Sequence, residues 1–198
     1  MTAPGRHPAP PRGGFAASLA IQRVSKNHTW LRLHRAKYDP LHFGTTRRGR
    51  FDAASGEFGV LYVARQIPGA FIETLVRDGV REISEARIGS FHVAEITVSR
   101  GLKFVDLAGK GLVRMGVDGR LNTGDYRVAQ RWSSAFFAHP DKADGILYPS
   151  RHDPKQHLAA LFDRAETLLT SKPCGTIRSY LGDREFYRLL DHYDIALL

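Results

Sequence analysis

The stretch from Phe43 to Gly79 constrains the fold more than any other, because it predicts a strand and a helix in one short unit. The apolar run from Val60 to Ala64 is typical of a buried strand. Pro68 suits the first turn of a helix, where its missing N–H group costs no hydrogen bond. Gly79 suits a left-handed cap at the other end. The sequence therefore predicts a helix over 68–78.

This predicted helix carries a carboxylate, Glu73, between Ile72 and Thr74. Removing an unpaired carboxylate from water is unfavourable by several kcal/mol, so Glu73 needs either solvent or a cationic partner. A basic loop just upstream could supply that partner. The loop contains Arg47, Arg48, Gly49 and Arg50.

Apolar periodicity predicts the remaining elements. Strands are expected at 29–34, 87–98, 102–108, 144–150 and 157–162, and helices at 125–139 and 183–192, with a short strand at the end. The short strands alternate with few helices and lack the regular spacing and GxGxxG motif of a Rossmann fold. The expected fold class is α+β, a single domain with a mixed, mostly antiparallel sheet and a few flanking helices.

Two of these elements present polar side chains of interest. Alternation along the first strand places Arg32 opposite Leu31 and Leu33, a pattern that by itself favours an exposed or ion-paired arginine over a ligand contact. The helix at 125–139 should back onto the sheet, and its first turns present Tyr126, Arg127 and Gln130 to solvent or to a ligand. The pattern favours solvent.

Six short motifs follow one another along the chain. They are WLRLHR at 30–35, GRF at 49–51, LYVA at 61–64, AFIETL at 70–75, QRWSSAF at 130–136 and DGILYPSR at 144–151. Each motif alone is common, but their order and spacing resemble the RES domain family, which is named for its arginine, glutamate and serine. The resemblance covers most of the chain from residue 28 onward.

One motif departs from the family pattern. The family commonly has GRWNPPG, whereas this chain has GRFDAASG at 49–56. Phe51 keeps the aromatic body, but Asp52, Ala53 and Ala54 alter the loop. Leu33 stands after the strand arginine, where an aromatic residue is common.

The resemblance implies a fold similar to ADP-ribosyltransferase toxins, a pocket for NAD, and a toxin activity that degrades or uses NAD. It makes Glu73, Arg32 and Arg50 the catalytic candidates, and Arg32, Arg50, Tyr62 and Ser150 the candidates for binding NAD. NAD would be the substrate, and no metal is expected. The implied partner is an antitoxin with a DNA-binding helix-turn-helix domain, and a homodimer within that complex is a further expectation.

The chemistry of NAD cleavage suits these residue types. Breaking the bond between nicotinamide and ribose builds positive charge on the ribose, which a fixed carboxylate such as Glu73 can stabilise. Arginines can hold the pyrophosphate, and Tyr62 can stack on the nicotinamide ring. Ser150, at a strand exit beside Pro149, can donate and accept hydrogen bonds without being buried, and no GxSxG motif marks it as a nucleophile. The acceptor, whether water, phosphate or a protein side chain, stays open.

Composition fits one domain with a basic arm. The 198 residues are 42% hydrophobic and carry a formal net charge of +9, which attracts nucleic acid, acidic proteins or phosphorylated small molecules. Residues 1–22 are expected to form a disordered arm rich in proline and glycine, and residues 23–198 the domain. The single cysteine, Cys174, in the turn-like SKPCGT, excludes an internal disulfide and a CxxC zinc site. With no long apolar run, the chain is expected to be cytoplasmic and free of membrane spans.

Two classes of function therefore remain. One is an enzyme that consumes NAD. The alternative is a basic nucleic-acid or protein-binding module without catalysis, which predicts arginines spread along a surface with interleaved aromatic residues. Only the enzyme gives Glu73 a role.

Overall fold

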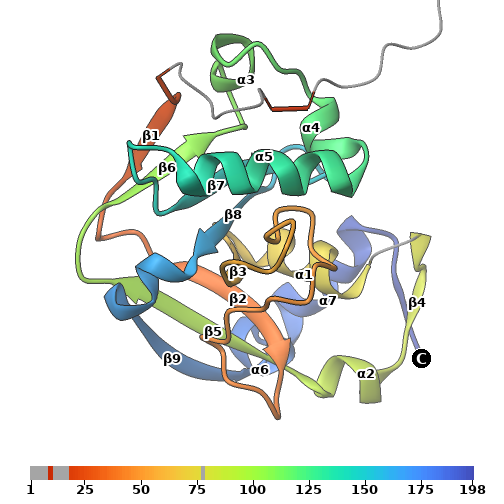
Figure 1. Cartoon of the computed structure of the whole chain (residues 1–198). Coiled ribbons are helices and arrows are strands. Elements are labelled where there is room, and N and C mark those ends of the chain that lie inside the picture. Colours follow the sequence, from red (N-terminus) through yellow and green to blue (C-terminus); the bar gives the residue numbers. More distant parts are fainter. Residues whose placement is uncertain (1–8, 11–17, 77–78) are drawn as a thin grey trace, which may run out of the picture.

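An eight-stranded sheet organises the computed structural model, which describes residues 9–10, 18–76 and 79–198 (Figure 1). In chain order its strands are β1 (Ile21–Val24), β2 (Trp30–Arg35), β3 (Val60–Ala64), β5 (Phe91–Val98), β6 (Leu102–Asp106), β7 (Gly145–Pro149), β8 (His157–Phe162) and β9 (Leu169–Thr176). Their order across the sheet is β1-β6-β7-β8-β3-β2-β5-β9. All neighbours pair antiparallel except β6 and β7, which are parallel. A second, small sheet pairs β4 (Glu82–Ile83) with β10 (Ala196–Leu197).

Helices flank this sheet. They are α1 (Ile67–Leu75), α2 (Glu85–Gly89), α3 (Gly111–Arg114), α4 (Arg120–Thr123), α5 (Tyr126–Ala138), α6 (Ile177–Leu181) and α7 (Asp183–His192), with a 3-10 turn, η2 (Asp163–Leu168). In Figure 1, α5 lies near β6 and β7, whereas α1 and α7 lie near β3 and β2. The expected α+β class, a single domain with a mostly antiparallel sheet, is confirmed. Within the described residues, no helix is long and apolar enough to cross a bilayer.

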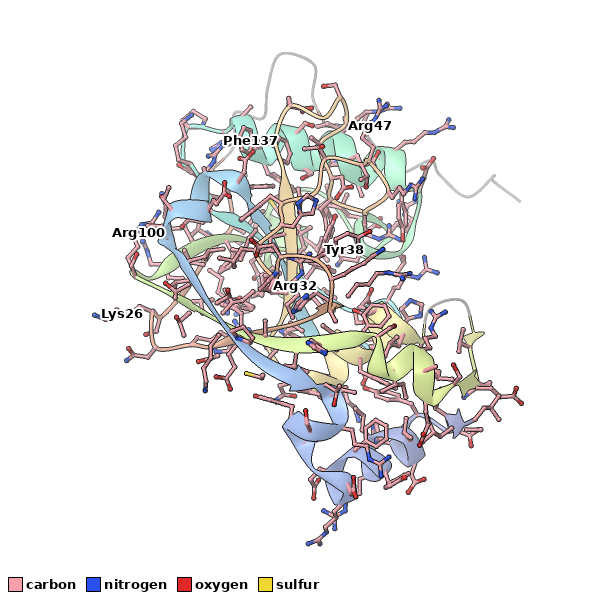
Figure 2. All side chains as sticks on the ribbon, turned by 90° about the horizontal axis from the view of Figure 1, so that it is seen from below. Lys26, Arg32, Tyr38, Arg47, Arg100 and Phe137 are labelled. Atoms are coloured by element: carbon pink, nitrogen blue, oxygen red, sulfur yellow. The ribbon has the colours of Figure 1, made fainter. Side chains whose placement is uncertain are left out.

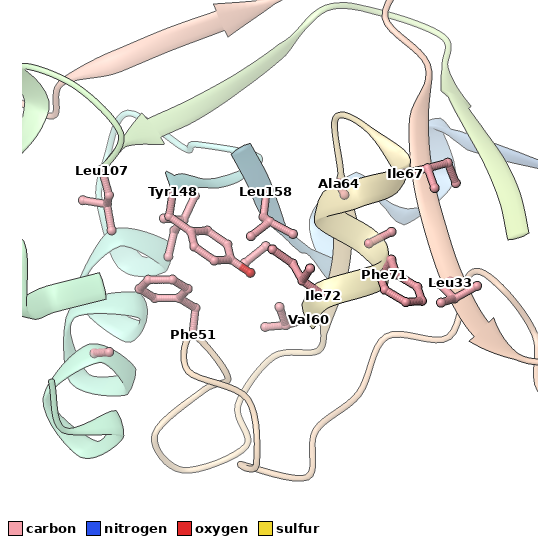
Figure 3. Packing of buried hydrophobic residues seen from close by; sticks show 14 of the residues in the cluster. Leu33, Phe51, Val60, Ala64, Ile67, Phe71, Ile72, Leu107, Tyr148 and Leu158 are labelled. Atoms are coloured by element: carbon pink, nitrogen blue, oxygen red, sulfur yellow. The ribbon is translucent and has the colours of Figure 1, made fainter. Parts of the chain in front are cut away.

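Strand β3 shows why the sheet has an apolar core on both faces. Val60 and Ala64 belong to one buried cluster, and Leu61 and Val63 to the other, as the alternation of side chains along a strand requires. The first cluster includes the buried faces of α1, α5 and α7, and Figure 3 shows part of it. The second is covered by loop residues, among them Phe43. Because both faces are buried, β3 is a continuous apolar run except at its tyrosine.

The predicted helix after β3 is present, but it is shorter than predicted. Pro68 lies in the first turn, and the helix ends at Leu75, with Val76 as its C-cap. Residues 77 and 78, the end of the predicted helix, lie outside the described residues. Gly79 has the predicted left-handed conformation, φ 77°, but it is not the cap of this helix.

Other predicted elements agree with the structure more closely. The strands at 60–64 and 157–162 and the helix at 183–192 have the predicted bounds, and α5 begins after an N-cap, Asp125, whose side chain accepts from the Arg127 N–H at 2.8 Å. The predicted strand at 102–108 ends early, at Asp106.

Two further expectations about secondary structure were wrong. The strand predicted at 87–98 begins only at Phe91, because the N-cap Ser84 starts a short helix through which Ile88 reaches the core. Cys174 was expected in a turn but lies in β9. Pro173 obscures that strand in the sequence, yet β9 is the last strand of the sheet, where a proline can be accommodated.

The end of the predicted N-terminal arm belongs to the folded part of the chain. Strand β1 begins at Ile21, Leu19 and Ala20 are buried, and the Ala20 carbonyl accepts from the Asp106 N–H at 2.8 Å. Most of the predicted arm, residues 1–8 and 11–17, lies outside the described residues.

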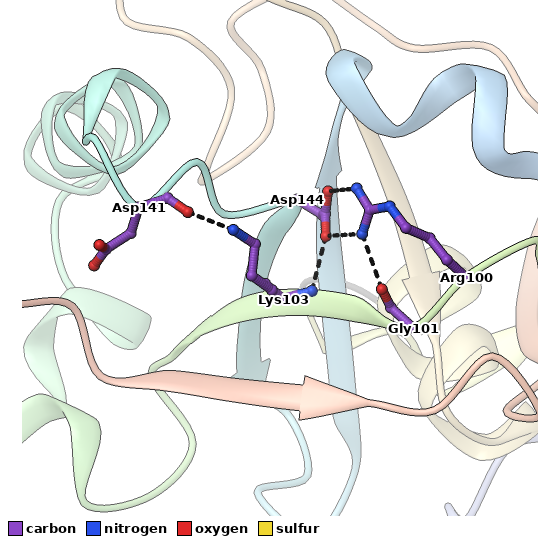
Figure 4. Close-up of polar contacts among 5 residues, drawn as sticks. All are labelled: Arg100, Gly101, Lys103, Asp141 and Asp144. Atoms are coloured by element: carbon purple, nitrogen blue, oxygen red, sulfur yellow. Dashed lines mark hydrogen bonds and ion pairs between the residues drawn. The ribbon is translucent and has the colours of Figure 1, made fainter.

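Asp144 links three adjacent strands, β6, β7 and β8, at the strand ends opposite α1. Its carboxylate accepts two hydrogen bonds from Arg100, at 2.9 and 2.7 Å, and one from the Lys103 N–H at 2.8 Å (Figure 4). Its carbonyl accepts from the Phe162 N–H at 2.9 Å. The residue is 1% exposed, so these partners replace the water that the carboxylate loses on folding.

We expect Asp144→Ala to lower the free energy of unfolding by about 2–3 kcal/mol, the scale of losing hydrogen bonds to a buried charged group. Urea denaturation measures this loss. The matched control is Asp118→Ala, which breaks the pair of Asp118 with Arg120, in which both side chains are about half exposed, and should leave the midpoint nearly unchanged. Equal midpoints for the two variants would contradict the role assigned to Asp144.

Candidate active site

The sheet opens between β2 and β3, and a cavity lies at the opening. These strands share a single registered pair, Leu31 with Ala64. Continuing that antiparallel ladder would pair Arg32 with Val63 and Leu33 with Tyr62. Instead, all of these residues line the cavity. The divergence of two central strands therefore creates the site.

The cavity has an empty volume of about 690 Å³, including its solvent-open mouth, within the range of small-molecule sites. Its walls come from β2, β3, β7, β8, α1, α4 and α5 and from the loops after residues 47 and 149. The polar and aromatic lining residues are Arg32, Arg48, Arg50, Tyr62, Glu73, Thr74, Asn122, Tyr126, Tyr148 and Arg151. Four of the five candidates from the sequence, Glu73, Arg32, Arg50 and Tyr62, thus meet here.

The fifth candidate, Ser150, lies behind Glu73. Its hydroxyl donates to Glu73 Oε1 at 2.6 Å and accepts from the N–H groups of His152 and Asp153 at 3.0 and 3.3 Å. Because the Ser150 oxygen accepts from both N–H groups, the single hydroxyl proton of Ser150 is donated to Glu73. Ser150 is 2% exposed, so the expectation that its hydroxyl would act without being buried was wrong. The serine fixes the position of the carboxylate.

Arg32 lines the cavity and also supports a neighbouring loop. Its Nη1 donates to the carbonyls of Pro40 and His42 at 2.5 and 3.2 Å, which anchors the loop after β2. Burial lowers the pKa of Arg32 to about 10, and the charge of Asp39 opposes that shift. Arg32 therefore stays charged at neutral pH. In Figure 2 it lies near the middle of the molecule, whereas Arg47 lies on the side that carries α5.

Arg50 is held at the junction of α4 and α5. Its Nη1 donates to the Gly124 carbonyl at 2.7 Å, and its guanidinium carbon lies 4.3 Å from the ring centre of Tyr126. Burial lowers the pKa of Arg50, and the nearby charge of Arg151 acts in the same direction. Nη2 is buried and has no hydrogen-bond partner among the described residues. An anion bound between Arg50 and Arg151 would relieve their repulsion.

Tyr62 holds the loop that departs from the family pattern. Its hydroxyl donates to Asp52 Oδ1 and accepts from the Phe51 N–H, both at 2.9 Å. Asp52 Oδ2 accepts from the Gly49 N–H at 2.9 Å. Burial and the Asp52 charge raise the pKa of Tyr62 well above its usual range, so its hydroxyl stays protonated. A Cβ at Gly49 would overlap both side chains, which explains the glycine.

Several residues that line the cavity were not predicted from the sequence. Tyr148 packs edge-on against Phe51 at 4.8 Å between ring centres (Figure 3), and Asn122 is buried on a helix of only four residues. Asn122 lies outside the family motifs, whereas Tyr148 lies within DGILYPSR at 144–151 and was not singled out. Arg151 could have been found, because it directly follows Ser150 in the last family motif.

The first turns of α5 differ from the solvated face that the sequence pattern favoured. Tyr126 lines the cavity. Gln130 instead donates to the carbonyls of Arg47 and Gly49, both at 2.9 Å, and so supports the basic loop. Arg127 is exposed and does not line the cavity.

No cluster of three or more histidine, cysteine, aspartate or glutamate side chains that could hold a metal ion occurs in the part of the chain that the structure describes. The cavity instead combines one fixed carboxylate with several guanidinium groups. Such a set can bind a phosphorylated ligand and stabilise positive charge within it.

The chain is similar to known proteins in sequence and in fold. The model of the RES domain matches residues 28–181. "Probable toxin y4kH" of Sinorhizobium fredii is 27% identical over 121 residues, which cover 61% of this chain and 89% of the relative. The M. tuberculosis MbcT–MbcA toxin–antitoxin complex contains a similar fold, with a TM-score of 0.58 and 18% identity over 78% of this chain and 87% of that chain. Because the family match spans most of the sequence, the chain belongs to the RES domain family.

Proposed function

We propose that this protein is the toxin of a toxin–antitoxin system and that it cleaves the bond between nicotinamide and ribose in NAD. The observation that carries the proposal is Glu73, held at 2.6 Å by the buried Ser150 on the wall of a cavity lined by arginines. Membership of the RES family and the likeness to a probable toxin support it.

In this proposal each wall of the cavity has a separate task. Glu73 faces the ribose, where positive charge develops as nicotinamide leaves. Arg50 and Arg151, with Arg32 as a further charge, bind the pyrophosphate, and the Tyr62 ring packs against the nicotinamide. Because nicotinamide is a good leaving group, these residues suffice without a metal. Phosphate, water or a protein side chain could each accept the ribosyl group, depending on which reaches the anomeric carbon.

A basic binding module without catalysis has less support. Such a module needs exposed arginines along a surface. Here Arg50 is 7% exposed, and it borders the same cavity as a carboxylate that would repel nucleic acid. The basic residues at the cavity thus fit a small phosphorylated ligand better than a polyanion.

We also propose an antitoxin as the cellular partner, because an enzyme that consumes NAD has to be held inactive in its own cell. The likeness in fold to a toxin that was solved in complex with its antitoxin supports this proposal. A helix-turn-helix domain in that partner and a homodimer of the toxin remain predictions. Purification of the active chain alone from its native host, without harm to that host, would contradict the need for a partner.

Incubation of the pure protein with NAD should release nicotinamide, and mass spectrometry of the ribosyl product identifies the acceptor. Parallel reactions without phosphate, with phosphate and with candidate proteins separate hydrolysis, phosphorolysis and transfer. Expression without a partner should lower cellular NAD and stop growth. Unchanged NAD in vitro and in cells that contain soluble protein would remove the proposed activity.

Glu73→Gln should reduce turnover by about a hundredfold or more, because it removes the negative charge that stabilises the transition state while keeping the shape of the side chain. NAD affinity should change little. The measurements are kcat, Kd and Tm of the variant. Glu166→Gln, at an exposed glutamate outside the cavity, is the control and should behave as the parent. If Glu73 only held α1 in place, Tm and activity would fall together.

Arg151→Ala should weaken NAD binding by roughly tenfold, as expected for the loss of one charge-assisted contact, with little change in Tm because Arg151 is exposed. Arg32→Ala and Arg50→Ala should weaken binding and also lower Tm, since both side chains hold backbone carbonyls. Titration calorimetry and thermal melts separate the two effects. Arg131→Ala, an exposed site on α5 outside the cavity, is the control, and an Arg151→Ala protein with parental affinity would exclude the pyrophosphate contact.

A further inference from the structure

Tyr193 contacts both of the elements that carry the Glu73–Ser150 pair, although it lies beyond residue 181, where the family match ends. It follows the last turn of α7, which it caps. Its hydroxyl donates to Asp153 Oδ2 at 2.9 Å, and its ring stacks on Phe71 at 6.3 Å between centres. One side chain thus joins the C-terminal segment to the walls of the cavity.

Through Asp153, Tyr193 contacts the loop that carries Ser150. Asp153 Oδ1 accepts from the Lys155 N–H at 3.0 Å, and Oδ2 lies 3.4 Å from Gln156 Nε2, its donor. The backbone N–H of Asp153 donates to Ser150 Oγ, and the Ser150 N–H donates to the Gln156 carbonyl at 2.8 Å. Asp153 therefore closes the turn whose N–H groups direct the serine hydroxyl.

Through Phe71, Tyr193 also contacts α1, the helix that carries Glu73. Phe71 is fully buried on α1, two residues before Glu73. A ring stacked on Phe71 limits how α1 can rotate or slide against the loop at 150–156. The distance between Glu73 and Ser150 depends on that relative position.

We propose that Tyr193 is a positioning residue that sets the loop at 150–156 against α1 and so keeps the Ser150 hydroxyl on Glu73. This inference rests on the proposed function for its effect on catalysis, but the positioning itself concerns the fold. Tyr193 touches no ligand in this scheme. It acts through Asp153 and Phe71.

The pKa shifts of Tyr193 and Asp153 both favour a persistent hydrogen bond between them. Burial, followed by the hydrogen bond to Asp153, raises the pKa of Tyr193, so the hydroxyl stays a donor. Burial tends to raise the pKa of Asp153, but the Lys155 N–H and the Tyr193 hydroxyl together lower it below its usual value. Around neutral pH the donor and the acceptor therefore keep their roles.

The test is Tyr193→Phe, which removes only the hydroxyl and keeps the ring on Phe71. We expect kcat per folded molecule to fall by roughly tenfold with unchanged Kd for NAD, less than the about hundredfold loss that ångström-scale misplacement can cause. Tyr187→Phe on α7 is the control, because the Tyr187 ring is 43% exposed and packs near Phe186 and Arg178. Its kcat should be parental. Parental kcat in Tyr193→Phe, or a loss explained entirely by unfolded protein, would overturn the proposal.

A second measurement does not depend on enzymatic activity. The amides of His152 and Asp153, which donate to Ser150, should exchange with solvent roughly tenfold faster in Tyr193→Phe than in Tyr187→Phe. In an Asp153→Ala background, Tyr193→Phe should add little to either effect, because the two side chains form one contact. If the parent protein does not cleave NAD, the proposed function is wrong, but the exchange rates still test the positioning role of Tyr193. Unchanged exchange rates would overturn that role, with or without NAD cleavage.

Discussion

The hydrogen bond from Ser150 to Glu73 is the interaction on which the candidate site depends. It joins the loop after β7 to α1, two elements separated by 77 positions in the sequence. A buried serine with two N–H donors on its oxygen has one proton to give, and it gives that proton to the carboxylate. The carboxylate is thereby held in one place before any ligand arrives, which is what electrostatic stabilisation of a transition state requires.

Glu73 lines the cavity that forms where the sheet opens. Where β2 and β3 diverge, the ladder that would have filled the space is replaced by a cavity, and the backbone needs other support. The arginines support neighbouring segments: Arg32 holds the carbonyls of Pro40 and His42, and Arg50 holds that of Gly124. The basic residues that would bind a phosphorylated ligand therefore also hold segments that border the cavity.

The sequence predicted the parts of the structure that depend on local pattern. The bounds of β3 followed from an apolar run, and the cluster of Arg32, Arg50, Tyr62 and Glu73 followed from the order of the family motifs. It did not predict β9, because Pro173 disfavours a strand unless one knows that the strand is at an edge. It also missed Tyr148, Asn122 and the burial of Ser150, since these depend on which distant segments pack together, and no local period encodes that packing.

The altered loop at 49–56 shows how a motif can change while its contacts persist. Phe51 is fully buried against Tyr148, so the aromatic anchor of the loop is kept. Asp52 stands where the family pattern has asparagine, and it uses both carboxylate oxygens as acceptors, one for the Gly49 N–H and one for the Tyr62 hydroxyl. An asparagine has only one acceptor oxygen and could not accept from both groups in this way. The aspartate therefore lets a loop without the family's proline-bearing turn keep Gly49 and Tyr62 at the cavity wall.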